Sequence, residues 1–181
     1  MDIKHIKRVF VLIGEHLIFA VLSLFFISVF PWALKYNTAK IIYTVVMGFA
    51  YSASVYGSSW HNSAKDYRAY KSLKKKMPES EVQFKLYMGF IYGIGIFVLN
   101  IVLLLLACNA ADVWNVVFRV FNFAFFGLVI DEKEKLSVIG GVIASVIPLA
   151  ASGIGYIAGR FDFRISEKYL PGIIYKKPNK K

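Results

Sequence analysis

The sequence predicts an all-α integral membrane protein: a bundle of four transmembrane helices with one further interfacial or re-entrant amphipathic helix. Hydrophobic residues make up 57% of the 181 residues, well above the roughly 45–50% of soluble domains. Long apolar runs alternate with short polar segments. Most lysines and arginines lie before the first run, between the second and third runs, and after the last run. We therefore predict one membrane domain over residues 1–181.

Four apolar stretches meet the length of about 20 residues that a helix needs to cross the hydrocarbon core. They cover about residues 9–34, 41–60, 86–108 and 136–159. The first follows the basic segment MDIKHIKR, as the core of a signal peptide would. It is longer than the about 7–15 residues of such a core, so we predict an uncleaved span.

The stretch 112–130 is also long enough to cross, but Arg119 lies near its middle. An arginine at the centre of a span costs about 2.5–3.5 kcal/mol on insertion scales. Asp112, Asn115, Arg119 and Asn122 follow one another at spacings of three, four and three, which places them on one face of a helix. We predict a helix that lies in the membrane interface or re-enters the membrane partway.

The distribution of lysine and arginine chooses between four and five spans. With four, seventeen of them lie on one side, in the amino-terminal segment, in residues 61–85 and in the tail 160–181, against four in the opposite connectors. A fifth span would move the tail across and abolish the bias. The positive-inside rule therefore predicts four spans in the cytoplasmic membrane, with both termini in the cytoplasm.

The basic segment 61–85 is predicted to form a cytoplasmic helical hairpin. Apolar residues recur at helical spacing from Tyr67 to Met77, and Pro78 is expected to end this helix and begin the next. Either the second span continues past the membrane, or a separate helix lies along the membrane surface. The predicted partners are the lipid bilayer and anionic lipid headgroups, at about 1 kcal/mol per nearby basic residue of this loop and of the tail.

Small residues mark the predicted helix contacts, because helices in lipid associate where their backbones can approach closely. We expect the second span, rich in small residues, to be central and the glycines of the third span to pack against it. Asn100 is expected to form a hydrogen bond across helices. The glycines chosen as packing positions are Gly48, Gly57, Gly89, Gly93, Gly155 and Gly159.

Ionisable residues within a span or close to its end are candidates for a functional site, and Glu15 and His16 lie about two turns inside the start of the first span. They are also explained by an interfacial position or by internal packing, and we favour that interpretation. The candidate intramembrane polar site consists of Glu15, His16, Asn115, Arg119 and Asn122.

Patterns for catalysis, cofactors and metals are missing from the sequence. It contains neither Cys-x-x-Cys nor His-Glu-x-x-His, and its single cysteine, Cys108, excludes an intrachain disulfide. The formal charge of +11 is accompanied by no nucleic-acid motif, so no nucleic acid is expected as a partner. We predict no enzyme activity, no cofactor, no metal and no catalytic residue.

Three stretches resemble a known group of proteins: YGSSWHNSAKDYRAYK, FRVFNFAFF, and IPLAASGIGYIAGRFDFRISEKYL with its late YKK. The chain is similar there to uncharacterised small multi-span membrane proteins of Gram-positive anaerobes of the Firmicutes type. This resemblance implies a bacterial inner-membrane protein and assigns no functional residue.

Two functions remain open. The leading hypothesis is an accessory or interaction protein of the membrane, or a subunit of a membrane complex, whose partners are other membrane proteins or a second copy of itself. The alternative is a small transporter, channel or transporter subunit with a polar path near Glu15, His16 and Arg119. A polar cavity that joins Glu15 to Arg119 would favour the transporter.

Overall fold

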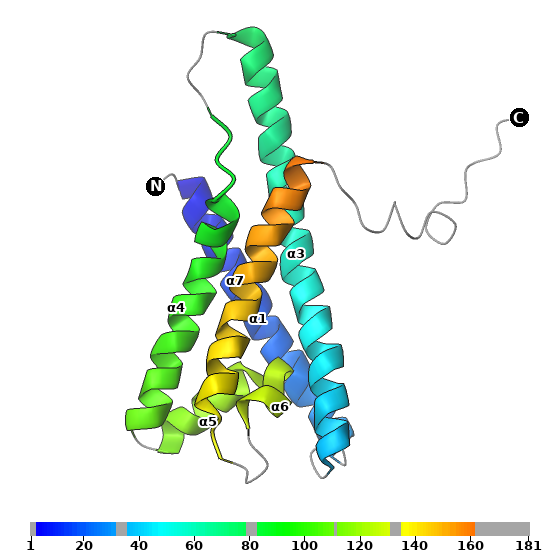
Figure 1. The fold of residues 1–181 in the computed structure, drawn as a ribbon, viewed down its shortest axis with the longest axis vertical. Helices are drawn as coiled ribbons and strands as arrows, with labels where there is room; N and C mark the ends of the chain where they lie inside the picture. Colours follow the sequence, from blue (N-terminus) through cyan, green and yellow to red (C-terminus); the bar gives the residue numbers. More distant parts are fainter. Residues whose placement is uncertain (1–2, 32–35, 79–82, 111, 131–134, 162–181) are drawn as a thin grey trace, which may run out of the picture.

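The computed structural model describes residues 3–31, 36–78, 83–110, 112–130 and 135–161. Within these ranges the chain is helical apart from turns, short connections and one isolated bridge between Ile130 and Leu136. Four helices are long and apolar enough to cross a membrane, which confirms that part of the prediction. They are α1 (Ile3–Val29), α3 (Asn37–Lys76), α4 (Met88–Asn109) and α7 (Val138–Arg160) (Figure 1).

Helix α3 has 40 residues and is therefore about 60 Å long, twice the thickness of a hydrocarbon core. Of the two alternatives for the basic segment, the structure has the continuous helix. The predicted second helical arm of the hairpin is not present at residues 83–85, because these residues are not helical. Phe84 packs against rings of α3 and α7 there, so tertiary contacts fix the backbone. Residues 79–82 lie outside the described residues.

The stretch 112–130 forms a bent pair of short helices. Helix α5 (Asp112–Phe121) is followed by the 3-10 turn η1 (Phe123–Phe125) and α6 (Phe126–Val129), with a bend of 83°. Ten residues of α-helix extend only about 15 Å, so neither piece alone spans a hydrocarbon core. The pair lies at the end of the bundle away from the start of α1 (Figure 1).

Helix α7 occupies the centre of the bundle, where the prediction had placed α3. It lies between α3 and α4 (Figure 1). In its apolar stretch of 18 residues, 44% of the residues are buried, which is the largest share among the four long helices. Gly89 and Gly93 of α4 face α7, not α3 as expected. Glycines of α4 thus meet α7 on one side, and glycines of α7 itself, Gly155 and Gly159, meet α3 on the other. The helix with the most glycine can therefore approach both neighbours closely, which explains its central position.

The other predicted packing glycines have different surroundings. Gly155 and Gly159 of α7 lie against the backbone of α3 at Tyr56 and Trp60, and Gly48 faces the ring of Phe125. Gly57 is exposed, and a Cβ built there would meet nothing within 4 Å. Gly57 is therefore not a contact between helices of this bundle.

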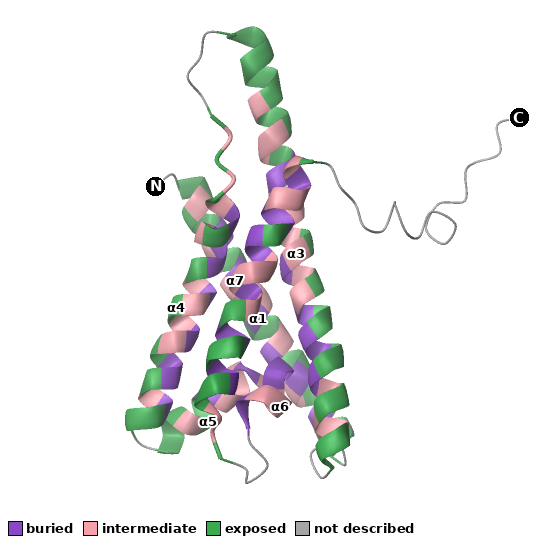
Figure 2. Cartoon of the chain, viewed as in Figure 1, coloured by how far each residue is buried: buried purple, intermediate pink, exposed green. Residues whose placement is uncertain are grey.

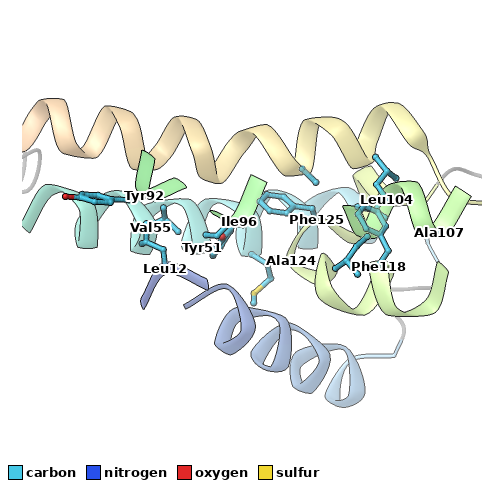
Figure 3. Close-up of a cluster of buried hydrophobic side chains, with 14 of the residues drawn as sticks. Leu12, Tyr51, Val55, Tyr92, Ile96, Leu104, Ala107, Phe118, Ala124 and Phe125 are labelled. Carbon is cyan, nitrogen blue, oxygen red and sulfur yellow. The ribbon is translucent and has the colours of Figure 1, made fainter. Parts of the chain in front are cut away.

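Large aromatic side chains fill the core. Tyr51, Tyr92, Phe118 and Phe125 are at most 2% exposed, and Figure 3 shows them among Val55, Ile96 and other aliphatic side chains. The outward faces of the long helices are apolar as well: Phe49, for example, is 75% exposed. Figure 2 shows these exposed positions along the outside of α1, α3 and α4. Apolar side chains thus cover both the inside and much of the outside.

Candidate functional site

A cluster of charged and hydroxyl side chains centres on Asp66, which follows the predicted second span by six residues. Lys4 Nζ donates to its Oδ1 at 2.7 Å, and Arg8 Nη2 donates to the same oxygen at 2.9 Å. Arg8 Nη1 donates to Oδ2, and the Tyr156 hydroxyl also donates to Oδ2 at 2.9 Å. One carboxylate therefore ties α3 to both α1 and α7.

Arg8 extends this network to α4. Its Nη1 donates to the hydroxyl oxygen of Tyr92 at 2.8 Å. Nδ1 of His5 lies 2.7 Å from the same hydroxyl oxygen and forms a further hydrogen bond with it. Side chains of all four long helices thus meet in one network, the Asp66 clasp, which consists of Lys4, His5, Arg8, Asp66, Tyr92 and Tyr156.

The central ion pair of the clasp is shielded from water. The side chains of Arg8 and Asp66 are 10% and 14% exposed, whereas that of Lys4 is 55% exposed. Burial alone would raise the pKa of Asp66, but hydrogen bonds from Arg8 and Lys4 and the positive charge of Arg8 lower it to about 2. Asp66 therefore carries its negative charge at neutral pH, and it requires partners because burying an isolated charge is costly.

A cavity of about 880 Å³ lies beside the clasp, and we call it the basic-end cavity. Its walls come from the start of α1, from α3 beyond the predicted span, from the residues that lead into α4, and from α7. The described residues that line it are Lys4, His5, Asp66, Ala69, Tyr70, Leu73, Gln83, Phe84, Lys85, Tyr87, Met88, Ile91 and Tyr156.

Phe84 fixes the wall of this cavity that precedes α4. Its ring stacks on Tyr156 with centroids 5.7 Å apart and planes 12° apart, and it meets the edge of Tyr67 at 5.3 Å. Tyr70 lies 6.2 Å from the same ring. Offset and edge-to-face pairs of this kind contribute about 0.5–1.5 kcal/mol each beyond burial, so this wall is held in place.

The predicted polar site is divided among separate contacts. Glu15 accepts a hydrogen bond from the hydroxyl of Ser58 on α3. The buried His16 has its Nδ1 2.7 Å from the Tyr51 hydroxyl, and its ring lies 4.3 Å from that of Phe121. These two residues therefore make contacts that join α1 to α3 and to α5.

The three candidate residues in 112–130 have three different environments. Asn122 is fully buried and donates from Nδ2 to Oδ1 of Asn100 at 2.7 Å, which is the bond across helices expected for Asn100. Arg119 lines a cavity of about 300 Å³ together with Lys40 of α3. Asn115 is only partly buried. Glu15 and Arg119 have different neighbours, so the structure does not gather the five residues into one site.

The sequence interpretation missed the Asp66 clasp. One signal was available: Asp66 is the only acidic residue between His61 and Met77, amid six lysines and arginines. Its strongest partner lies 58 residues away in the chain and Tyr156 lies 90 away, so no local spacing connects them. Among the described residues, no group of three or more His, Cys, Asp or Glu side chains could hold a metal ion.

Comparison with known proteins adds no assignment. No protein-family model, curated protein or solved structure matches this chain. The similarity to Firmicutes membrane proteins stays a prediction, and the chemistry of the site rests on its own geometry.

Proposed function

We propose that this chain is a multi-pass protein of the bacterial cytoplasmic membrane that works as an accessory or interaction protein. Its working end is the basic end, where the Asp66 clasp and the basic-end cavity lie. The observation that carries this proposal is the separation of the two kinds of polar residue. Charged groups gather around a cavity at one end of the bundle. In contrast, candidate polar residues such as His16 and Asn122 form hydrogen bonds with other side chains inside the bundle.

The proposed topology places this basic end in the cytoplasm, in accordance with the positive-inside rule. The start of α1 and the end of α7 lie at the same end of the bundle (Figure 1). The apolar outer faces suit contact with lipid, and the part of α3 beyond Trp60 projects past the hydrocarbon. The bent α5–α6 pair then occupies the opposite interface as a re-entrant element.

A transporter is the second candidate, and the contacts support it less. Its polar path would join Glu15 to Arg119, but Glu15 bonds to Ser58 and Arg119 faces Lys40 and apolar side chains. Between α1 and α5, the His16 and Phe121 rings are in direct contact. These contacts favour a packing role for the polar residues, and we propose no catalytic role for any of them.

Cysteine labelling in intact cells tests the topology. The native Cys108 is exposed near the end of α4, at the predicted outer side. In a Cys108→Ser background, Ala110→Cys, at an exposed position just after the predicted span 86–108, is expected to react with a membrane-impermeant maleimide in intact cells. In the same background, Lys75→Cys is expected to react only after lysis, because Lys75 is exposed at the basic end. Labelling of Lys75→Cys in intact cells would overturn the orientation.

The interaction role is tested on the same cells by crosslinking in the membrane and purification in mild detergent. A discrete higher-mass species is expected, and it should contain either a second copy of the chain or another membrane protein. Recovery of monomer alone under all conditions would contradict the proposal while leaving the topology untouched.

A further inference from the structure

We propose that the basic-end cavity binds the phosphate headgroup of an anionic lipid from the cytoplasmic leaflet. Lys4 and Lys85 would contact the phosphate, and the first carbons of the acyl chains would lie along Met88 and Ile91. This inference rests on the proposed membrane placement and adds a defined ligand site to it.

The charge of the cavity selects an anion. Lys4 and Lys85 line it, and the Lys4 side chain is 55% exposed, so its ammonium remains accessible. Asp66 is the only carboxylate among the described lining residues, and its charge is already paired with that of Arg8, which does not line the cavity. The balance is positive, and lysine ammonium groups bind phosphate as strong point charges.

The rest of the lining selects an amphiphile over a small soluble anion. Leu73, Met88 and Ile91 give the cavity an aliphatic side, and Tyr70 and Phe84 give it an aromatic one. Free phosphate would leave these surfaces in contact with water, whereas a lipid covers them with its glycerol and acyl carbons. A volume of about 880 Å³ lies within the roughly 300–1,000 Å³ of sites for small molecules.

The position of the cavity matches the depth of a headgroup. Met88 is the first residue of α4 and Tyr87 precedes it, so the cavity begins where the third span enters the hydrocarbon. Tyrosines at this level are typical of the membrane–water interface, and lysines there extend their ammonium groups toward phosphates. A lipid of the cytoplasmic leaflet would reach the cavity without leaving its layer.

The walls are fixed before a ligand arrives. The Asp66 clasp holds α1, α3 and α7 together on one side, and the stacking of Phe84 on Tyr156 holds the segment before α4 on the other. A preformed site loses less entropy on binding than a mobile loop does. The cavity therefore differs from the lysine-rich end of α3, whose exposed side chains attract any anionic surface.

The charge test uses the purified full-length protein in neutral detergent and native mass spectrometry with phosphatidylglycerol or phosphatidylcholine. Phosphatidylglycerol is expected to bind more tightly. Lys4→Gln together with Lys85→Gln should weaken its binding about fivefold per lysine and about twenty-five-fold in total. The matched control, Lys75→Gln with Lys76→Gln, removes the same charge from exposed positions outside the cavity and should retain affinity within about threefold. Equal losses in the two double variants would overturn the proposal.

The shape test leaves the charge unchanged. Ala69→Trp fills the cavity from an exposed position on α3, and Ser72→Trp places the same ring on an exposed position that does not line it. The first should lose at least tenfold in affinity for phosphatidylglycerol and the second should not. If both bind like the wild type, the lipid binds only to the surface and the cavity site is wrong.

A soluble competitor separates the two sources of phosphate. Glycerol phosphate is expected to displace phosphatidylglycerol only at concentrations far above those of the lipid. Displacement at equal concentrations would assign the cavity to a soluble phosphate ester and overturn the lipid. A protein that shows the proposed cysteine labelling but fails these tests would keep its topology and lose only the lipid site.

Discussion

The basic end of the bundle and the end that contains α5 and α6 are held together by different chemistry. At the basic end, full charges meet: Arg8 and Asp66 form an ion pair that reaches four helices through tyrosine hydroxyls. Near α5 and α6, two polar contacts among the described residues are between neutral groups. Asn122 donates to Asn100, and the backbone N–H of Gly127 donates to the Thr44 hydroxyl at 2.7 Å.

This difference follows from the distance of each contact from water. Asn100 lies in the middle of α4, where an ion would be costly in hydrocarbon, and small amides and hydroxyls satisfy their bonds there without net charge. Asp66 lies beyond the predicted span, so its remaining exposure and three donors keep it ionised. In the proposed membrane placement, the Arg8–Asp66 ion pair joins the helices at the basic end, and the neutral Asn122–Asn100 bond joins them at the depth of the spans.

The largest effect is expected when the buried ion pair loses its acid. Asp66→Asn keeps the side-chain shape but leaves Arg8, whose side chain is 10% exposed, without its counter-charge. Removing one partner of a buried pair typically costs about 3 kcal/mol or more. The free energy of unfolding, measured by denaturant titration in detergent micelles, should fall by about that amount.

Lys4→Gln provides the control, because it removes an ion pair to the same carboxylate from a side chain that is 55% exposed. Exposed pairs contribute at most about 1 kcal/mol. Acid gives a second check: the pKa of Asp66 is about 2 in the folded protein, below its ordinary value. Its contribution is present above about pH 4 and lost as the pH falls toward 2, and Asp66→Asn should lack this loss. Equal costs for the two variants would refute the assignment.

The second effect compares two glycines. A Cβ at Gly155 would collide with the backbone oxygen of Tyr56 on α3, whereas a Cβ at Gly57 would meet nothing within 4 Å. Backbone cannot move aside as a side chain can, so Gly155→Ala should destabilise the fold by about 2 kcal/mol. Gly57→Ala should stabilise it by up to about 1 kcal/mol, because alanine is the better helix former. The same denaturant titration measures both, and similar changes in the free energy of unfolding would mean that α3 and α7 do not pack as described.

The two glycines also mark a limit of prediction from sequence. Both stand among small residues of apolar stretches, and only the tertiary arrangement places one against backbone and leaves the other open. The four long helices were predictable, because the length and hydropathy of a run are local properties. The central position of α7 was not, since a small-residue pattern states that a helix packs closely but not against which partner.

The polar residues show the same division. The stripe from Asp112 to Asn122 was predictable from its spacing, and a bond from Asn100 across helices was expected. The 83° bend, however, turns Asn122 into the core while Asp112 stays exposed, so the stripe does not act as one surface. The Asp66 clasp depends on pairs 58 to 90 residues apart in the chain, and no periodicity within a helix reports such a pair.

The smallest effect is expected for the neutral pair, and it tests the comparison most directly. In a double-mutant cycle, Asn100→Leu and Asn122→Leu should each destabilise the protein, because the remaining amide loses its bond at a fully buried position. The coupling energy should be about 1 kcal/mol, in the range of neutral hydrogen bonds within membrane proteins. Asn115→Leu is the control on the same stripe, since Asn115 is only partly buried. A coupling energy as large as the cost of Asp66→Asn would show that neutral and charged contacts hold the two ends equally, and the distinction between them would fail.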